Sequence, residues 1–125
     1  MIYWKGVEKS APFELGGGFM FTINGITWDI VFVEPYSDDL FRSDGSLTCG
    51  VTDFGKRTVF LSNMLRGAFL RKVCAHELCH CYCMSFNEYM PIEEEERLAN
   101  WVSLYAEDLV DTLRCIMPLI QYAVA

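Results

Sequence analysis

The segment 74–83, which reads CAHELCHCYC, concentrates seven residues of types that could bind a metal ion. It holds both histidines of the chain, His76 and His80, with Glu77 between them. On a helix, side chains four residues apart lie on one face, so two imidazole nitrogens can reach one ion. A glutamate beside them can accept a proton from a water molecule at that ion. The H-E-x-x-H pattern therefore predicts a zinc site with Glu77 as general base.

Four of the six cysteines lie in the same segment and offer a different set of ligands. Thiolates favour closed, structural zinc sites. Cysteines at alternate positions of one helix, however, point in three directions, because two residues turn a helix by about 200°. We therefore expect these thiols to pack rather than chelate, and we expect Cys49 and Cys115 to be small buried side chains. Since the sequence shows no export signal, we expect reduced thiols.

A catalytic zinc needs a third protein ligand and one open position, and the chain has no third histidine. The acidic run 93–96, at the start of a second predicted helix, is the natural donor. Such a run also suits a solvated first turn, where carboxylates complement the helix dipole. Helical spacing favours Glu95, which lies nearer than Glu96 to the middle of a predicted apolar face formed by Ala99, Val102, Ala106, Leu109 and Leu113.

The segments before the motif are predicted to form a small sheet. Asn24-Gly25 is a strong turn signal between apolar arms of a hairpin, and the arm 26–33 is predicted to be a central strand. The polar segment 34–46 predicts a loop with a short helical turn. Two more strands are predicted within 47–53 and 57–62. We expect 1–18 to be an N-terminal leader or a loosely held segment.

Two helices are predicted to follow these strands. Apolar residues and both histidines recur every three or four positions between Asn63 and Met84. Pro91 marks the start of a second helix that runs to about Leu113, and Pro118 is expected to end regular helix. The order predicts an α+β fold, in which a small, mainly antiparallel sheet packs on the motif helix and a second long helix. We expect a single domain over 19–125.

The charge of the chain excludes several classes of partner. Seventeen acidic residues against ten basic ones give a formal net charge of −7, and the basic residues do not cluster. A nucleic-acid groove or an anionic membrane surface requires a basic footprint, so we expect neither partner. Without an apolar signal segment or a membrane-spanning stretch, the sequence predicts a soluble cytoplasmic protein.

Two blocks of the sequence together resemble a known family. HELCH is followed by a block that reads Glu96-Arg97-Leu98-Ala99-Asn100-Trp101-Val102-Ser103. This pair is similar to the H-E-x-x-H and E-x-x-A-N-x-F-A blocks of the glutamate-type zinc metallopeptidases, or gluzincins. The closest likeness is to the small ImmA/IrrE-type domains of bacteria, phages and mobile elements, although Val102 and Ser103 replace the usual Phe and Ala. The resemblance covers about 26–109, and such domains place a small sheet before the motif helix.

The resemblance implies roles for residues outside the motif. By this likeness Glu96 is the third ligand, and Asn100 is a partner that orients a ligating histidine. It also implies a metalloendopeptidase that cleaves a specific protein substrate, such as a regulatory factor. No motif selects a donor for the oxyanion, and Tyr82, Tyr89 and Tyr105 are candidates by chemistry alone.

Two other interpretations stay open on the sequence. The chain could be a metal-binding interaction or regulatory protein that keeps the site and hydrolyses little, or its histidines could share a helix face without binding any metal. The ligand set would accept another divalent metal in place of zinc. The sequence leaves the substrate and the oligomeric state unknown.

Overall fold

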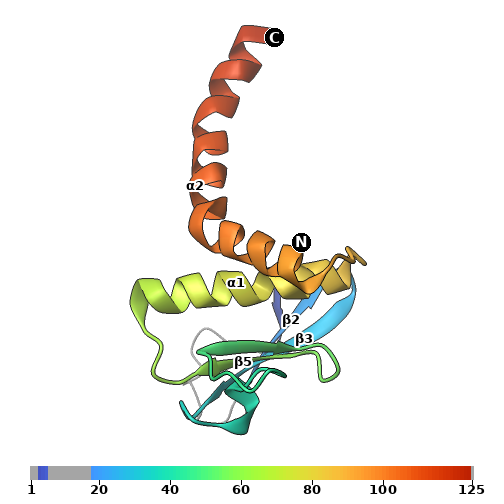
Figure 1. Cartoon of the computed structure of the whole chain (residues 1–125). Coiled ribbons are helices and arrows are strands. Elements are labelled where there is room, and N and C mark those ends of the chain that lie inside the picture. The colour runs from blue at the N-terminus through green and yellow to red at the C-terminus, as the bar shows by residue number, and fades with distance from the viewer. Residues whose placement is uncertain (1–2, 6–17, 125) are drawn as a thin grey trace.

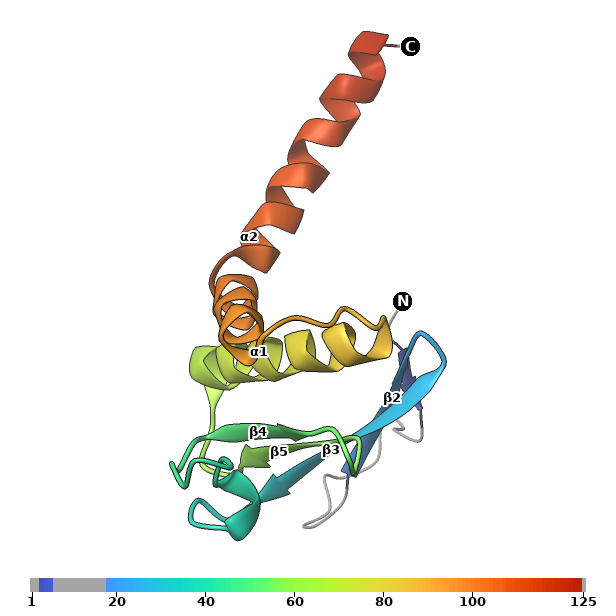
Figure 2. The same cartoon turned by 45° about the vertical axis from the view of Figure 1, so that its right-hand side comes forward.

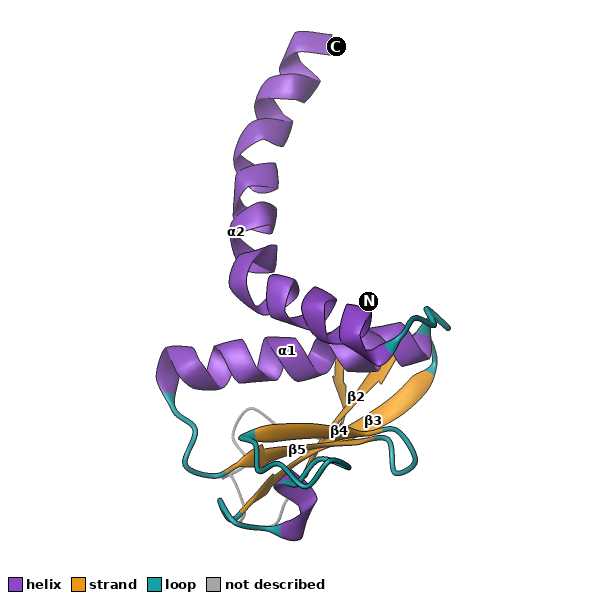
Figure 3. Cartoon of the chain, in the orientation of Figure 1, coloured by secondary structure: helices purple, strands orange, loops and turns teal. Residues whose placement is uncertain are grey.

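A computed structural model of the chain describes residues 3–5 and 18–124, which form one five-stranded sheet and two long helices (Figure 1). The sheet order is β1-β2-β3-β5-β4; β3 and β5 are parallel, and the other neighbours are antiparallel. Helix α1 lies across one face of the sheet, and α2 crosses α1 on the side away from it (Figure 3). The predicted α+β fold, with a mainly antiparallel sheet on two helices, is confirmed. The strands are β1 (Tyr3–Lys5), β2 (Gly18–Ile23), β3 (Ile26–Val33), β4 (Gly50–Asp53) and β5 (Thr58–Ser62).

The predicted hairpin is the β2–β3 pair. Asn24 and Gly25 have positive φ angles of 49° and 78°, the left-handed backbone that a tight two-residue turn between twisted strands requires. The arm 26–33 is the middle strand of the sheet, as predicted, and Trp28 on it is fully buried. Of the segment predicted as a leader, 3–5 pair with β2 as β1; most of the rest lies outside the described residues.

Helix α1 (Gly67–Ser85) carries the histidine motif, but it begins four residues later than predicted. The chain from Asn63 to Arg66 is a turn followed by extended backbone, and Gly67 takes a φ of +58° at the helix start. The helix ends at Ser85, whose Oγ accepts a hydrogen bond from the buried Trp28 indole at 2.9 Å. This bond ties the end of α1 to the hairpin.

Helix α2 (Ile92–Val124) starts where Pro91 predicted, but the predicted end near Leu113 is wrong. The helix continues through Pro118. Proline removes one intrahelical hydrogen bond, and at an exposed position water can satisfy the freed carbonyl. Figures 1 and 2 show that α2 bends in its first half, so that its far half projects away from the sheet. In that first half the Ser103 hydroxyl donates a 2.8 Å bond to the Asn100 carbonyl, a local contact that often bends helices.

Two predictions of burial are wrong. Cys49 and Cys115 are exposed, because Cys49 lies in the loop before β4 and Cys115 on the projecting half of α2. The predicted apolar face of α2 is buried only where α1 covers it. Ala99 is fully buried there, whereas Leu109 and Leu113 are about half exposed.

Candidate metal centre

Three side chains from two helices converge at one point above the sheet edge. His76 and His80 come from α1, four residues apart, and Glu96 comes from the first turns of α2. One ligand atom from each lies within 4.8 Å of the others. The Glu96 carboxylate has one oxygen 3.1 Å from His76 Nε2 and the other 3.0 Å from His80 Nε2. Two imidazoles and one carboxylate are the protein ligands of an open, catalytic type of zinc site.

The close approach of α2 places Glu96 here. Ala99, one turn after the acidic run, is fully buried against Cys79 and Cys83 of α1. A small side chain at a helix crossing lets the two backbones come near each other. The carboxylates at the start of α2 are therefore held beside the second half of the motif.

Glu95 has a different partner from the neighbouring carboxylate. Its Oε2 lies 2.5 Å from Nδ1 of His80, on the far side of the ring, and both side chains are buried. Since a carboxylate only accepts, His80 Nδ1–H is the donor, and the tautomer then leaves the Nε2 lone pair directed at the cluster. A carboxylate that orients a ligating histidine in this way is a common feature of metal sites. Helical spacing favoured Glu95 as the third ligand, whereas in the structure Glu95 lies outside the group of three side chains and contacts the outer nitrogen of His80.

Glu77 is buried beside the cluster and held in place by the sheet. Its side chain is 7% exposed, and Oε2 lies 3.9 Å from His76 Nε2. The Thr52 hydroxyl on β4 donates to Oε1 at 2.9 Å. Strand β4 can approach α1 this closely because of Gly50, where a Cβ would lie 2.9 Å from a Val73 methyl and 3.2 Å from Glu77 Cγ. The carboxylate therefore has a fixed position, with one oxygen directed toward the histidines.

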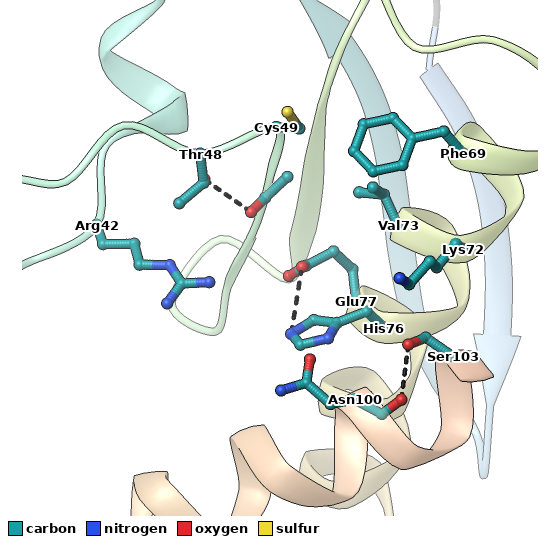
Figure 4. Close-up of a pocket in the computed structure, with 11 residues that line it drawn as sticks. Arg42, Thr48, Cys49, Phe69, Lys72, Val73, His76, Glu77, Asn100 and Ser103 are labelled. Atoms are coloured by element: carbon teal, nitrogen blue, oxygen red, sulfur yellow. Dashed lines mark hydrogen bonds and ion pairs between the residues drawn. The ribbon is translucent and has the colours of Figure 1, made fainter. Parts of the chain in front are cut away.

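Two adjoining clefts open onto this carboxylate. The larger, about 580 Å³, is lined by β4 and the loop before it, and reaches His80 and Glu96. The smaller, about 240 Å³, continues past His76 along α1 (Figure 4). Arg42 lines both, and its guanidinium lies 3.9 Å from the Glu96 carboxylate. The site is thus reached from solvent along β4, the last strand of the described sheet.

Several residues with predicted roles lie elsewhere or stay untested. Asn100 is exposed and lines the smaller cleft beside His76 (Figure 4); its part as an orienting partner stays a prediction. Of the three candidate oxyanion donors, Tyr82 stacks on Phe86, Tyr105 packs against Trp101, and Tyr89 is 83% exposed. None of the three lines either cleft.

Thr52, Gly50 and Arg42 were missed by the sequence analysis. They come from the loop and strand before the motif and are brought to it only by the fold. A glycine within a predicted strand is the one available signal, since it often marks a close backbone approach.

The cysteines of α1 lie outside the group of His76, His80 and Glu96. Cys81 packs into the core against the sheet, and Cys79 and Cys83 pack against α2. Burial raises the pKa of the Cys79 thiol to about 12, and no thiol of the described residues belongs to the group of three side chains that converge. These thiols therefore contribute packing, and the described cysteines are all free.

Comparison with protein-family models, curated proteins and solved structures gives no match for this chain. Among the residues that the structure describes, no helix is long and apolar enough to cross a membrane.

Proposed function

We propose that this protein is a zinc-dependent metallopeptidase whose ligands are His76, His80 and Glu96. The observation that carries the proposal is Glu77. It is a buried carboxylate beside the cluster, positioned by Thr52 and open to a cleft. A structural zinc site closes its coordination with four protein ligands and has no use for a general base.

Each residue of the site would have a separate role in the reaction. Zinc held here would supply Lewis acidity, which polarises a carbonyl group and makes a water molecule acidic near neutral pH. Glu77 would accept the proton of the attacking water and deliver it to the leaving amine nitrogen. Glu95 would keep His80 in the tautomer that presents Nε2 to the metal. Arg42, the guanidinium that lines both clefts, is the group placed to stabilise a developing negative charge.

The substrate would be an extended segment of a protein. Strand β4 ends the order of the described sheet, and all four of its residues line the larger cleft. An extended peptide can add to such an edge by main-chain hydrogen bonds, which would draw its carbonyls past Glu77. The motif resemblance supports a specific regulatory protein as substrate. Free cysteines support the cytoplasm as compartment.

A matched pair of variants tests this function. We would incubate zinc-loaded protein and its Glu77→Gln variant with a library of peptides from a bacterial proteome, and read cleavage by mass spectrometry. The proposal expects metal-dependent cleavage by the wild type and a loss of about 10²-fold or more in the variant. Equal cleavage by both would contradict the role of Glu77. A wild type that binds zinc and cleaves nothing would favour the alternative, a metal-binding regulatory protein.

A further inference from the structure

The far half of α2 carries an apolar face that no other described element covers. In Figures 1 and 2 this half projects from the rest of the molecule. Its apolar residues continue, without a break, the spacing of the residues that pack on α1. The series alternates steps of three and four residues: Ala99, Val102, Ala106, Leu109, Leu113, Ile116 and Ile120.

Burial along this series changes while the pattern does not. Ala99 is fully buried and Val102 is half-buried against α1, whereas Leu113 and Ile120 are each 46% exposed. An apolar repeat with an average of 3.5 residues is the seam of helices that pack side by side. The first residues of the series therefore pack on α1, whereas the last ones have the same spacing but contact no other described element.

Apolar and charged residues lie on different sides of α2 around the seam, which is the series from Ala99 to Ile120. The positions that flank it are mostly apolar, which widens the face beyond a two-helix seam. The charged residues lie on the opposite side of the helix. The apolar flanking residues are Tyr105, Val110, Met117 and Leu119, the polar ones are Ser103 and Thr112, and the charged residues on the opposite side are Glu107, Asp108, Asp111 and Arg114.

We propose that this face is the surface through which copies of this chain associate, α2 against α2. A second copy presents the same uncharged seam, so the surface is self-complementary. The four exposed residues of the seam, Leu109, Leu113, Ile116 and Ile120, and the apolar residues that flank them would bury several hundred Å² per copy, which approaches the roughly 800 Å² per partner of a standard stable interface. The charged side has three carboxylates and one guanidinium, which disfavours an anionic membrane as the occupant. Most of the stability of a helix in a protein comes from packing of its apolar face, so association would stabilise the projecting half of α2.

The test compares two substitutions of the same kind on one helix. Leu113 lies in the seam and is 46% exposed; Leu104 lies off it and is 54% exposed. We would measure molar mass by light scattering with size-exclusion chromatography at about 100 µM, since interfaces of this size dissociate at micromolar concentrations or below. We expect the wild type and Leu104→Glu at twice the 14.3 kDa of one chain or more, and Leu113→Glu at 14.3 kDa.

The controls separate association from folding and from lipid binding. Ile120→Glu should reproduce the effect of Leu113→Glu, and both variants should keep the thermal unfolding transition of the sheet domain. A wild type of 14.3 kDa at this concentration would overturn the proposal, as would equal masses for the two leucine variants. A monomeric wild type that floats with neutral phosphatidylcholine vesicles would overturn it in favour of a lipid-facing helix. None of these readouts depends on the metal site.

Discussion

The two neighbouring carboxylates Glu95 and Glu96 should differ in what they contribute to metal affinity. Glu96 has an oxygen near each Nε2 of the motif histidines, so it is placed as a ligand. Glu95 contacts only the outer nitrogen of His80, so it acts on the metal through that ring. Replacing each by glutamine keeps its shape and removes its charge.

The magnitudes follow from these contacts. Glu95→Gln replaces a charge-assisted bond at 2.5 Å with a neutral amide, and loss of such an orienting partner costs about 10- to 100-fold in metal affinity. That factor corresponds to roughly 1.4 to 2.7 kcal/mol. Glu96→Gln removes the only anionic ligand of the three, so we expect a loss larger than 100-fold. The ranking of the two variants is the test.

The assay is zinc competition against a chromophoric chelator at pH 7. Glu94→Gln is the matched control, since Glu94 belongs to the same helical turn and is exposed. It should bind zinc like the wild type. A loss at Glu95 greater than that at Glu96 would exchange the two roles, and equal losses at all three positions would show a general charge effect with no specific ligand.

Three further predictions test the scaffold. Ser85→Ala removes the acceptor of the buried Trp28 indole and should lower the free energy of unfolding by about 1–3 kcal/mol in urea titrations; an unchanged midpoint would contradict that contact. Gly50→Ala forces a methyl group against α1 and should lower the free energy of unfolding by about 1–3 kcal/mol, and with it most of the proposed peptidase activity; full stability would mean that β4 does not approach so closely. Iodoacetamide at pH 8 should modify the exposed Cys49 and Cys115 quickly, and the buried Cys79, Cys81 and Cys83 only after denaturation; fast reaction of more than three thiols, the half-buried Cys74 included, would refute that burial.

The sequence was sufficient wherever the deciding signal is local. The Asn24-Gly25 turn requires left-handed backbone that few other pairs adopt, so the hairpin could be predicted from two residues. His76 and His80 share a helix face by spacing alone, so their convergence needed only a helix.

The other features of the site and of the fold depend on how the helices and strands pack against one another. Adjacent residues on a helix point about 100° apart, and only the crossing of α2 over α1 decides which of Glu95 and Glu96 reaches both histidines. Thr52 contacts Glu77 across 25 residues of chain, which no local pattern encodes. The expected helix end at Pro118 follows from the local cost of proline, which removes a backbone hydrogen bond. Exposure to water makes that cost tolerable, because water can satisfy the freed carbonyl.

The central claim, a metal site made of His76, His80 and Glu96, is tested most directly by titration with Co²⁺ followed by absorption spectroscopy. With imidazole and carboxylate ligands, bound Co²⁺ shows only weak absorption bands in the visible range. Thiolate ligands add an intense charge-transfer band in the near ultraviolet. We predict saturation at one equivalent without that band in the wild type, and no saturable binding in His76→Ala. A thiolate band, or the absence of stoichiometric binding to the wild type, would contradict the account.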